Sequence, residues 1–425
     1  MRKYTLAFFA IAFSIGVQAQ LKITGEIRPR AEFRDGFKTL KQDGLEPAFF
    51  VEQRSRLGID FKKDKILLKL SFQDIRFWGG ASQIYKTDNA LFNMNEAWAG
   101  YKISDYSTIK VGRMHLDYDN ARILGNLAWA QQSRSHDLVK FEYASEGGFN
   151  LHIGAAFNQE TVNANAEPAR LFSTFYSGVN NYKSMQYAWG NTKYDAGSFS
   201  FLALSTGYQV ADSSQNFLFT VGPYWKHDFG GLKVEMEGYY QLGKDASDTD
   251  VSAYMGSIAL GTKLGETALW AGVDYLSGND PDATENNSFS PLFGTNHKFY
   301  GFMDYFYVGN PAGNVGLTDL YLKLNFKLTD KSNLLAHGHY FMSQATILEG
   351  SEEADSYLGT ELDLVFNSNV DKGVNLKIGF SAMDPGDSMG LIKSGDPSKM
   401  TFWGWTMLTI KPVLFESKKS LSLDR

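Results

Sequence analysis

Arginine, the side chain best suited to binding carboxylate groups, is concentrated in the first third of this sequence. Its guanidinium group stays charged and donates paired hydrogen bonds to a carboxylate. Between Gln20 and Lys140 there are 20 basic and 15 acidic residues, whereas the chain from Phe141 onward has 19 and 32. The candidate anion-binding residues are Lys22, Arg28, Arg30, Arg34, Arg54, Arg56, Arg76, Arg113, Arg122 and Arg134. Such a set is suited to pass anionic solutes along without covalent chemistry.

Residue types used in catalysis and metal binding also occur, but in patterns that define no site. Residues 133–137 contain serine, histidine and aspartate, yet a hydrolase triad is defined by spatial geometry that sequence neighbours do not supply. His337 and His339 share one face of a predicted strand, a spacing that metals use, but no third ligand is adjacent. The absence of cysteine excludes disulfides and thiolate sites. We therefore expect no catalytic residue, no metal and no cofactor.

The first arginines lie on segments in which apolar and polar residues alternate. From Leu21 to Arg34 the odd positions are apolar or small, and the even positions carry six charges. A period of two places these sets on opposite faces of a β-strand. Residues 49–61 repeat the pattern, with Arg54 and Arg56 on the charged face. Strands of this kind separate lipid from an aqueous lumen, so we expect the charged face to point inward.

Two further predictions depend on which face points inward. In residues 65–77 the alternation changes phase, so we expect a β-bulge near Gln73 that places Arg76 on the lumen side. Trp403 and Trp405, in the last predicted strand, are expected in the aromatic girdle at a membrane interface.

Alternation bounded by turn residues predicts eighteen strands. Most have ten to fourteen residues, above the roughly 5–6 usual in soluble proteins and suited to the roughly 9–11 tilted residues that cross a bilayer. The approximate spans are 21–34, 49–61, 65–77, 92–103, 107–114, 138–145, 149–158, 182–194, 198–208, 216–227, 232–242, 251–263, 267–277, 317–328, 332–344, 355–367, 373–383 and 399–411. Short turns alternate with long connections, and we expect the connection 278–316 to narrow the lumen. Since backbone groups in hydrocarbon must be paired, the sheet has to close.

The two ends of the chain differ from the strands. The sequence opens with Arg2 and Lys3, an apolar run and a small-residue site, which predicts a signal peptide at residues 1–19. No later window approaches the roughly 18 apolar residues of a membrane helix. The predicted organisation is a signal peptide at 1–19, a barrel at 20–412 and a tail at 413–425. The expected fold class is all-β: a single transmembrane antiparallel β-barrel of about 18 strands, with short periplasmic turns and long extracellular loops.

Three segments resemble the alginate export family of outer-membrane porins. The longest is GRMHLDYDNARILGNLAWAQQSRSHDLVKFEY at residues 112–143, and the others are RSRLG at 54–58 and NHKFYG at 296–301. The resemblance implies a monomeric 18-stranded barrel in the bacterial outer membrane that exports alginate through an arginine-rich constriction. By position, the residues expected to line it are Arg28, Arg30, Arg54, Arg56, Arg76, Arg113, Arg122 and Arg134. The chain departs from this group of barrels in its last residues, because such barrels usually end on a strand with an aromatic last residue.

The sequence and the resemblance together predict an outer-membrane channel for anionic solutes, with an alginate-like polysaccharide or its oligomers as cargo. Its expected partners are that solute and outer-membrane lipid, with no nucleic acid, and the barrel is expected to be a monomer. A less selective porin for small nutrients is one alternative. A barrel-embedded hydrolase is another, although no Ser and His pair on adjacent strands at the lipid boundary is evident. A secreted β-sandwich or lectin is a third, against which the long strands argue.

Overall fold

The computed structural model describes residues 19–80, 92–159, 176, 178, 181–210, 214–306 and 314–417. The predicted signal peptide, apart from its last residue, lies outside these ranges, as does the end of the predicted tail. All eighteen predicted strands lie within the described residues.

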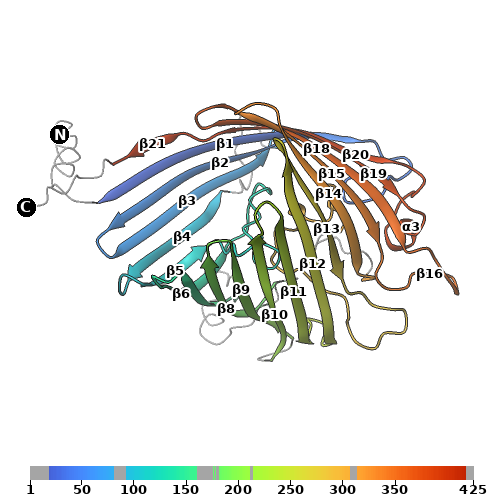
Figure 1. Cartoon of the computed structure of the whole chain (residues 1–425), viewed down its shortest axis with the longest axis horizontal. Coiled ribbons are helices and arrows are strands. Elements are labelled where there is room, and N and C mark those ends of the chain that lie inside the picture. Colours follow the sequence, from blue (N-terminus) through green and yellow to red (C-terminus); the bar gives the residue numbers. More distant parts are fainter. Residues whose placement is uncertain are drawn as a thin grey trace, which may run out of the picture.

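Eighteen antiparallel strands form one sheet (Figure 1). They are β1 (Gln20–Asp35), β2 (Ala48–Lys63), β3 (Ile66–Phe77), β4 (Asn93–Lys102), β5 (Ser107–Met114), β6 (His136–Ala144), β7 (Phe149–Phe157), β8 (Ser184–Tyr194), β9 (Gly197–Gln209), β10 (Gln215–Asp228), β11 (Lys233–Lys244), β12 (Asp250–Leu264), β13 (Thr267–Leu276), β14 (Leu317–Lys327), β15 (Ser332–Met342), β18 (Tyr357–Asp371), β19 (Val374–Pro385) and β20 (Thr401–Ile410). Each lies within a few residues of its predicted span.

The sheet closes on itself because β1 pairs on both sides. It pairs with β2 along its length, and its second half pairs with β20, for example Arg30 with Met407. An extra strand, β21 (Val413–Glu416), pairs with the start of β1 after a short break at Pro412, which has no N–H to donate. The fold is therefore a closed 18-strand antiparallel barrel with one extra strand, and the sheet extends past residue 412 to Glu416.

The expected β-bulge lies on the strand beside the one predicted. β3 pairs with β2 without a shift, whereas the pairing of β3 with β4 shifts between Ser71 and Phe72, leaving Asn95 on β4 as the additional residue. β3 therefore keeps its phase. Arg76 pairs with Gln53, on the outward face of β2, so the prediction that it points into the lumen is wrong.

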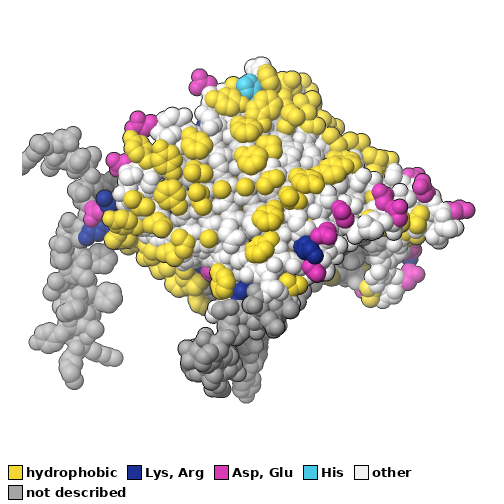
Figure 2. Space-filling view, turned by 90° about the horizontal axis from the view of Figure 1, so that it is seen from below, with side chains coloured by type: hydrophobic (Ala, Val, Ile, Leu, Met, Phe, Trp, Pro, Cys, Tyr) yellow, Lys and Arg dark blue, Asp and Glu magenta, His cyan; other side chains and the backbone are white. Residues whose placement is uncertain are grey.

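Large apolar side chains cover the outer face of the barrel. Ile27, Leu57, Phe201, Leu322 and Phe380 are among them, each with more than 40% of its surface exposed. Figure 2 shows such side chains spread over one face, with most acidic and basic groups near its edges. A continuous apolar exterior of this size is suited to contact lipid.

Trp403 and Trp405 lie inside the barrel and not in an interfacial girdle, so that expectation is wrong. On β20 they pair with Arg34 and Glu32, which face inward on β1. Trp403 is fully buried, and its indole Nε1 donates a hydrogen bond to Glu32 Oε2 at 2.9 Å. The alternation of β20 has aromatic residues on both faces, so it does not distinguish inside from outside.

Short turns join the strands at the end of the barrel where β1 begins, and longer connections join them at the other end. The longer connections include a small hairpin, β16 (Leu348–Glu349) and β17 (Glu352–Glu353), a single 3₁₀ turn, η1 (Asn296–Lys298), and one helical turn, α3 (Met389–Ile392). Within the described ranges, no helix has the length and apolar character needed to cross a membrane.

Candidate functional site

Two long connections fold into the barrel interior. We call residues 115–135, between β5 and β6, the first inner loop, and the described residues 277–306 and 314–316, between β13 and β14, the second inner loop. The first contacts β1 and β2 on one side of the barrel and β11 and β13 on the other. It therefore crosses the lumen. The sequence predicted the second loop as the plug and missed the first.

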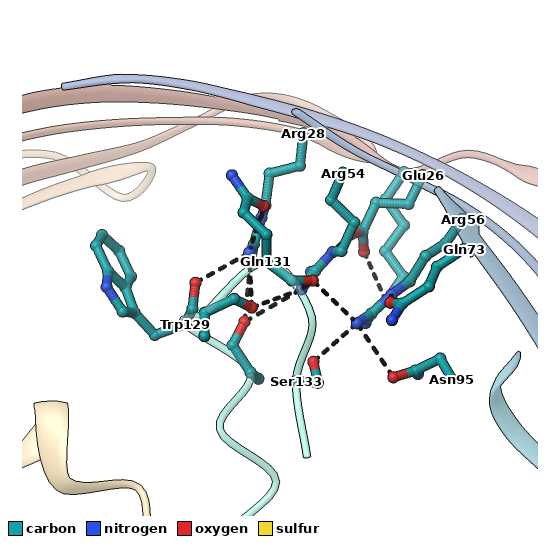
Figure 3. A network of polar contacts seen from close by, with 12 residues as sticks. Glu26, Arg28, Arg54, Arg56, Gln73, Asn95, Trp129, Gln131 and Ser133 are labelled. Carbon is teal, nitrogen blue, oxygen red and sulfur yellow. Dashed lines mark hydrogen bonds and ion pairs between the residues drawn. The ribbon is translucent and has the colours of Figure 1, made fainter. Parts of the chain in front are cut away.

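Arg28 on β1 is the main anchor of the first inner loop (Figure 3). Its guanidinium group donates to the backbone carbonyls of Ala128 at 2.9 Å, Trp129 at 2.9 Å and Ala130 at 3.2 Å, and to Oε1 of Gln131 at 2.8 and 3.2 Å. All these acceptors are neutral oxygens on consecutive residues. The predicted anion ligand is thus occupied by the protein's own backbone.

Arg54 and Arg56 on β2 contact the same loop. Nη1 of Arg54 donates to the carbonyls of Ala128, Ala130 and Gln131, each at 3.3 Å. Nη2 of Arg56 donates to Ser133 Oγ at 2.8 Å and more weakly to the carbonyl of Gln131 at 3.4 Å. Figure 3 shows these guanidinium groups pointing from the barrel wall toward one stretch of loop.

This wall contains more arginine than glutamate. Five arginines on β1 and β2 point inward, namely Arg28, Arg30, Arg34, Arg54 and Arg56, beside three glutamates, namely Glu26, Glu32 and Glu52. Glu26 pairs with Arg54, Glu32 pairs with both Arg30 and Arg34, and Glu52 pairs with Arg30. Among the described residues, no carboxylate pairs with Arg28 or Arg56, so the wall has a surplus of positive charge.

Arg122 anchors the first inner loop to the opposite wall. It is 2% exposed and forms ion pairs with Glu237 on β11 at 2.9 Å and Asp274 on β13 at 2.7 Å, while the hydroxyl of Tyr300 accepts a further hydrogen bond at 2.9 Å. Burial lowers the pKa of Arg122, but the charges of Asp274, Tyr300 and Glu237 more than offset this and raise it well above its usual value. Arg122 is therefore a structural cation and not a free ligand.

The two inner loops also contact each other. The indole ring of Trp129 stacks on the imidazole of His297, with ring centroids 4.7 Å apart. Arg134 Nη1 donates to the carbonyl of Gly294 at 2.9 Å, and burial lowers the pKa of Arg134 to about 10, so it remains charged at neutral pH. The second loop reaches the far wall, where Met303 N–H donates to Glu361 on β18. The lumen is thus narrowed by two loops packed as one unit.

The remaining predicted ligands are divided between the two faces of the wall. Arg34 faces inward, packed over Phe37 and Phe50, and Lys22 faces inward near the start of β1, 3.6 Å from Glu416. Arg76 and Arg113 face outward at the loop end of their strands, paired with Asp74 and Asp137. The alternation rule fails there because a strand that has left the hydrocarbon can carry charge on its outer face.

The residues with triad chemistry are not brought together. Ser133 Oγ accepts a hydrogen bond from Arg56, Ser135 Oγ donates to the carbonyl of Asn95, and His136 contacts the Tyr182 hydroxyl. Asp137 faces the opposite side of β6 from His136 and pairs with Arg113. This arrangement does not form a nucleophile, base and acid in contact.

A cavity of about 260 Å³ lies between Arg122 and the wall of β11–β14. Trp270, Tyr321 and Phe299 give it aromatic sides, and Lys298, Lys323 and Glu235 give it charged ones. Aromatic surfaces with a few charged groups are typical of small-molecule sites, and the volume suits a single sugar ring. This cavity could not be predicted from the sequence, because its residues come from separate strands and from both inner loops.

Comparisons with known proteins agree with this architecture. Residues 19–404 match the family model described as alginate export. The fold is similar to OpdK of Pseudomonas aeruginosa (TM-score 0.60, 11% identity, covering 92% of this chain and 98% of that one) and to a BenF-like porin of Pseudomonas fluorescens Pf-5 (0.62, 11%, 93% and 99%).

It is also similar to OccK2 (OpdF) of Pseudomonas aeruginosa, solved in complex with glucuronate, with a TM-score of 0.62, 12% identity and coverage of 93% of this chain and 97% of that one. No curated protein sequence matches this chain. The family model covers most of the sequence, and the barrel is that of the outer-membrane porins. The chain therefore belongs to the alginate export family and forms an outer-membrane channel for solutes.

Proposed function

We propose that the channel passes anionic solutes, with an alginate-like polyuronate or its oligomers as cargo, by diffusion and without a covalent step. The observation that carries this proposal is the positive surplus on the β1–β2 wall, where Arg28 and Arg56 bind only neutral oxygens among the described residues. Hydrogen bonding to carbonyls occupies their N–H groups but leaves their charge. In a narrow lumen with low-dielectric walls, such charge concentrates anions.

This mechanism differs from a ladder of free guanidinium groups. Because Arg28, Arg54 and Arg56 hold the first inner loop, they act on a passing anion through their field more than by direct contact. The cavity beside Arg122 offers direct contact instead, since Lys298 and Lys323 are suited to a uronate carboxylate and Trp270 and Tyr321 to the ring. Glu235, which also lines the cavity, would repel the carboxylate and so direct it toward the lysines.

Two further points belong to this proposal. The barrel is proposed to act as a monomer that contacts outer-membrane lipid through its apolar exterior, with no nucleic-acid partner. A less selective porin for small nutrients is the alternative, because a positive lumen would also pass small anions. Both differ from a hydrolase, for which the separated Ser133, His136 and Asp137 provide no machinery.

Oligouronates are expected to block the single-channel current, whereas neutral oligosaccharides of equal length are not. The measurement compares both in planar bilayers at about 0.1 M salt and at about 1 M, where the Debye length falls from roughly 10 to roughly 3 Å. Uronate block that weakens at high salt supports the proposal. Equal block by both sugars, or none by either, would leave the general porin as the better account.

A further inference from the structure

A cluster outside the arginine wall has the geometry of a metal site. His337 and His339 point inward from β15, and Asp363 on β18 is paired directly with His337. One ligand atom from each of these three residues lies within 4.8 Å of the other two. No third ligand could be predicted from the sequence, because Asp363 is brought into place only by the pairing of β15 with β18.

The two imidazoles present nitrogen atoms that lack partners. His337 Nδ1 and His339 Nε2 are buried, and neither has a hydrogen-bond partner in the described part of the chain. His339 is 2% exposed, and its other nitrogen, Nδ1, lies 2.9 Å from Asp319 Oδ2. A carboxylate on one nitrogen fixes the tautomer in which the other nitrogen offers its lone pair, as in metal sites of the carboxylate–histidine type.

The charge of the surroundings favours a cation. Asp319, Glu361 and Asp363 are all at most 1% exposed, and Glu361 Oε2 also lacks a hydrogen-bond partner within the described residues. On the neighbouring strand, Lys323 is paired with His337 and contributes one positive charge. Buried carboxyl groups either bind a proton or are compensated by paired groups or metal ions, so three of them beside one lysine form surroundings that a bound cation would stabilise.

We propose that His337 Nδ1, His339 Nε2 and Asp363 Oδ2 bind one divalent zinc-class ion, with a water molecule or solute in the fourth position. Zinc bonds of roughly 2.0–2.2 Å place neighbouring ligand atoms somewhat over 3 Å apart. His339 Nε2 lies 3.9 Å from Asp363 Oδ2, so small side-chain rotations bring the ligands together. Two nitrogens and one carboxylate select Zn²⁺, Ni²⁺ or Cu²⁺ over Mg²⁺ and Ca²⁺, which prefer oxygen ligands.

The ion would lie beneath the second inner loop. The N–H of Phe302 donates to Asp363 Oδ2 at 3.2 Å, and the Phe302 ring is 5.2 Å from the ring of His337. Metal binding would therefore fix the wall on which this loop rests. This inference is independent of the proposed cargo, since it concerns only side chains of β14, β15 and β18.

The test is metal retention by the folded, tag-free barrel in detergent. The protein is stripped with chelator, incubated with Zn²⁺ in excess Mg²⁺, desalted and analysed for metal, and Co²⁺ is used in parallel for its visible absorption. We expect one Zn²⁺ per chain in the unaltered protein and none in His337→Gln or His339→Gln. His227→Gln, which alters a half-buried histidine on β10, is expected to retain the ion.

Asp319→Asn provides a finer test, because loss of the carboxylate that orients His339 is expected to weaken binding about 10–100-fold. Folding of each variant is checked by its heat-dependent migration in gels, and Asp363→Asn replaces any histidine variant that fails to fold. The proposal is overturned if the unaltered barrel retains no Zn²⁺, if Mg²⁺ displaces it, or if the folded histidine and Asp363 variants retain as much as the control.

Discussion

Replacing Arg28 by methionine is expected to increase the single-channel conductance and to make the current less steady. Methionine keeps much of the side-chain length but donates no hydrogen bonds, so the carbonyls of residues 128–130 lose Arg28 as a donor and keep only the hydrogen bonds from Arg54 and Arg30, at 3.1–3.3 Å. A hydrogen bond to a charged group contributes about 1.5–3 kcal/mol. Losing even one raises the population of displaced loop by about tenfold or more.

The measurement is conductance in planar bilayers at about 1 M salt, where screening removes most of the effect of the lost charge. Arg113→Met is the matched control, because it removes the same charge from an arginine that is ion-paired with Asp137 on the outward face of β5, away from the first inner loop. Its conductance should equal that of the unaltered channel. If Arg28→Met also conducts normally, the first inner loop is held in the lumen by other contacts and the anchoring role is wrong.

Replacing Arg122 by methionine is expected to destabilise the barrel more than any other single arginine change. Glu237 and Asp274 would remain buried without their cation, since their side chains are each 2% exposed. Removing one partner of a buried ion pair typically costs about 3–5 kcal/mol. The measurement is the free energy of unfolding in denaturant, followed by the change in gel migration that accompanies barrel unfolding.

Removing the charges of Glu237 and Asp274 as well tests whether the unpaired carboxylates cause the loss of stability. The triple variant Arg122→Met, Glu237→Gln, Asp274→Asn is expected to recover most of the lost stability, because no buried charge is then left unpaired. Lys244→Met breaks an exposed pair with Asp248 and should change stability little. A triple variant as unstable as the single one would show that Arg122 acts through packing against Phe299 and not through charge.

The strands were predictable because the alternation in this chain comes from a strong physical requirement. Each strand has one face toward lipid and one toward water, so side chains such as Ile27 and Arg28 separate cleanly. Turn residues then mark the ends. The pattern was sufficient for the number of strands, their approximate limits and the inward orientation of Arg28, Arg30, Arg54 and Arg56.

The alternation gave wrong orientations where a strand is not required to have one apolar face toward lipid and one polar face toward water. At the loop end of β3 and β5 the outer face need not be apolar, so Arg76 and Arg113 point outward. On β20 aromatic residues occur on both faces, which concealed the inward position of Trp403. Because the additional residue of the β-bulge, Asn95, lies on β4 and not on β3, the alternation of β3 continues unchanged and Arg76 points outward.

The site itself was only partly predictable, because its roles depend on contacts between distant segments. The sequence identified Arg28, Arg54 and Arg56 as neighbours but not the loop carbonyls that occupy them, 74 to 103 residues away. Nor did it indicate that Arg122 reaches Asp274, or that Asp363 completes a set with two histidines. Alternation assigns a side chain to a face, whereas the path of a long loop inside the barrel depends on tertiary packing.

The most direct test of the central claim is the reversal potential of the unaltered channel under a salt gradient at low ionic strength, where charges in the lumen are least screened. The surplus of positive charge on the β1–β2 wall predicts that chloride is more permeant than the cation, so the reversal potential should have the sign that chloride sets. It should shift toward zero when Arg28 and Arg56 are both changed to methionine. A potential of the sign set by the cation, or one that the double change leaves unaltered, would contradict the account.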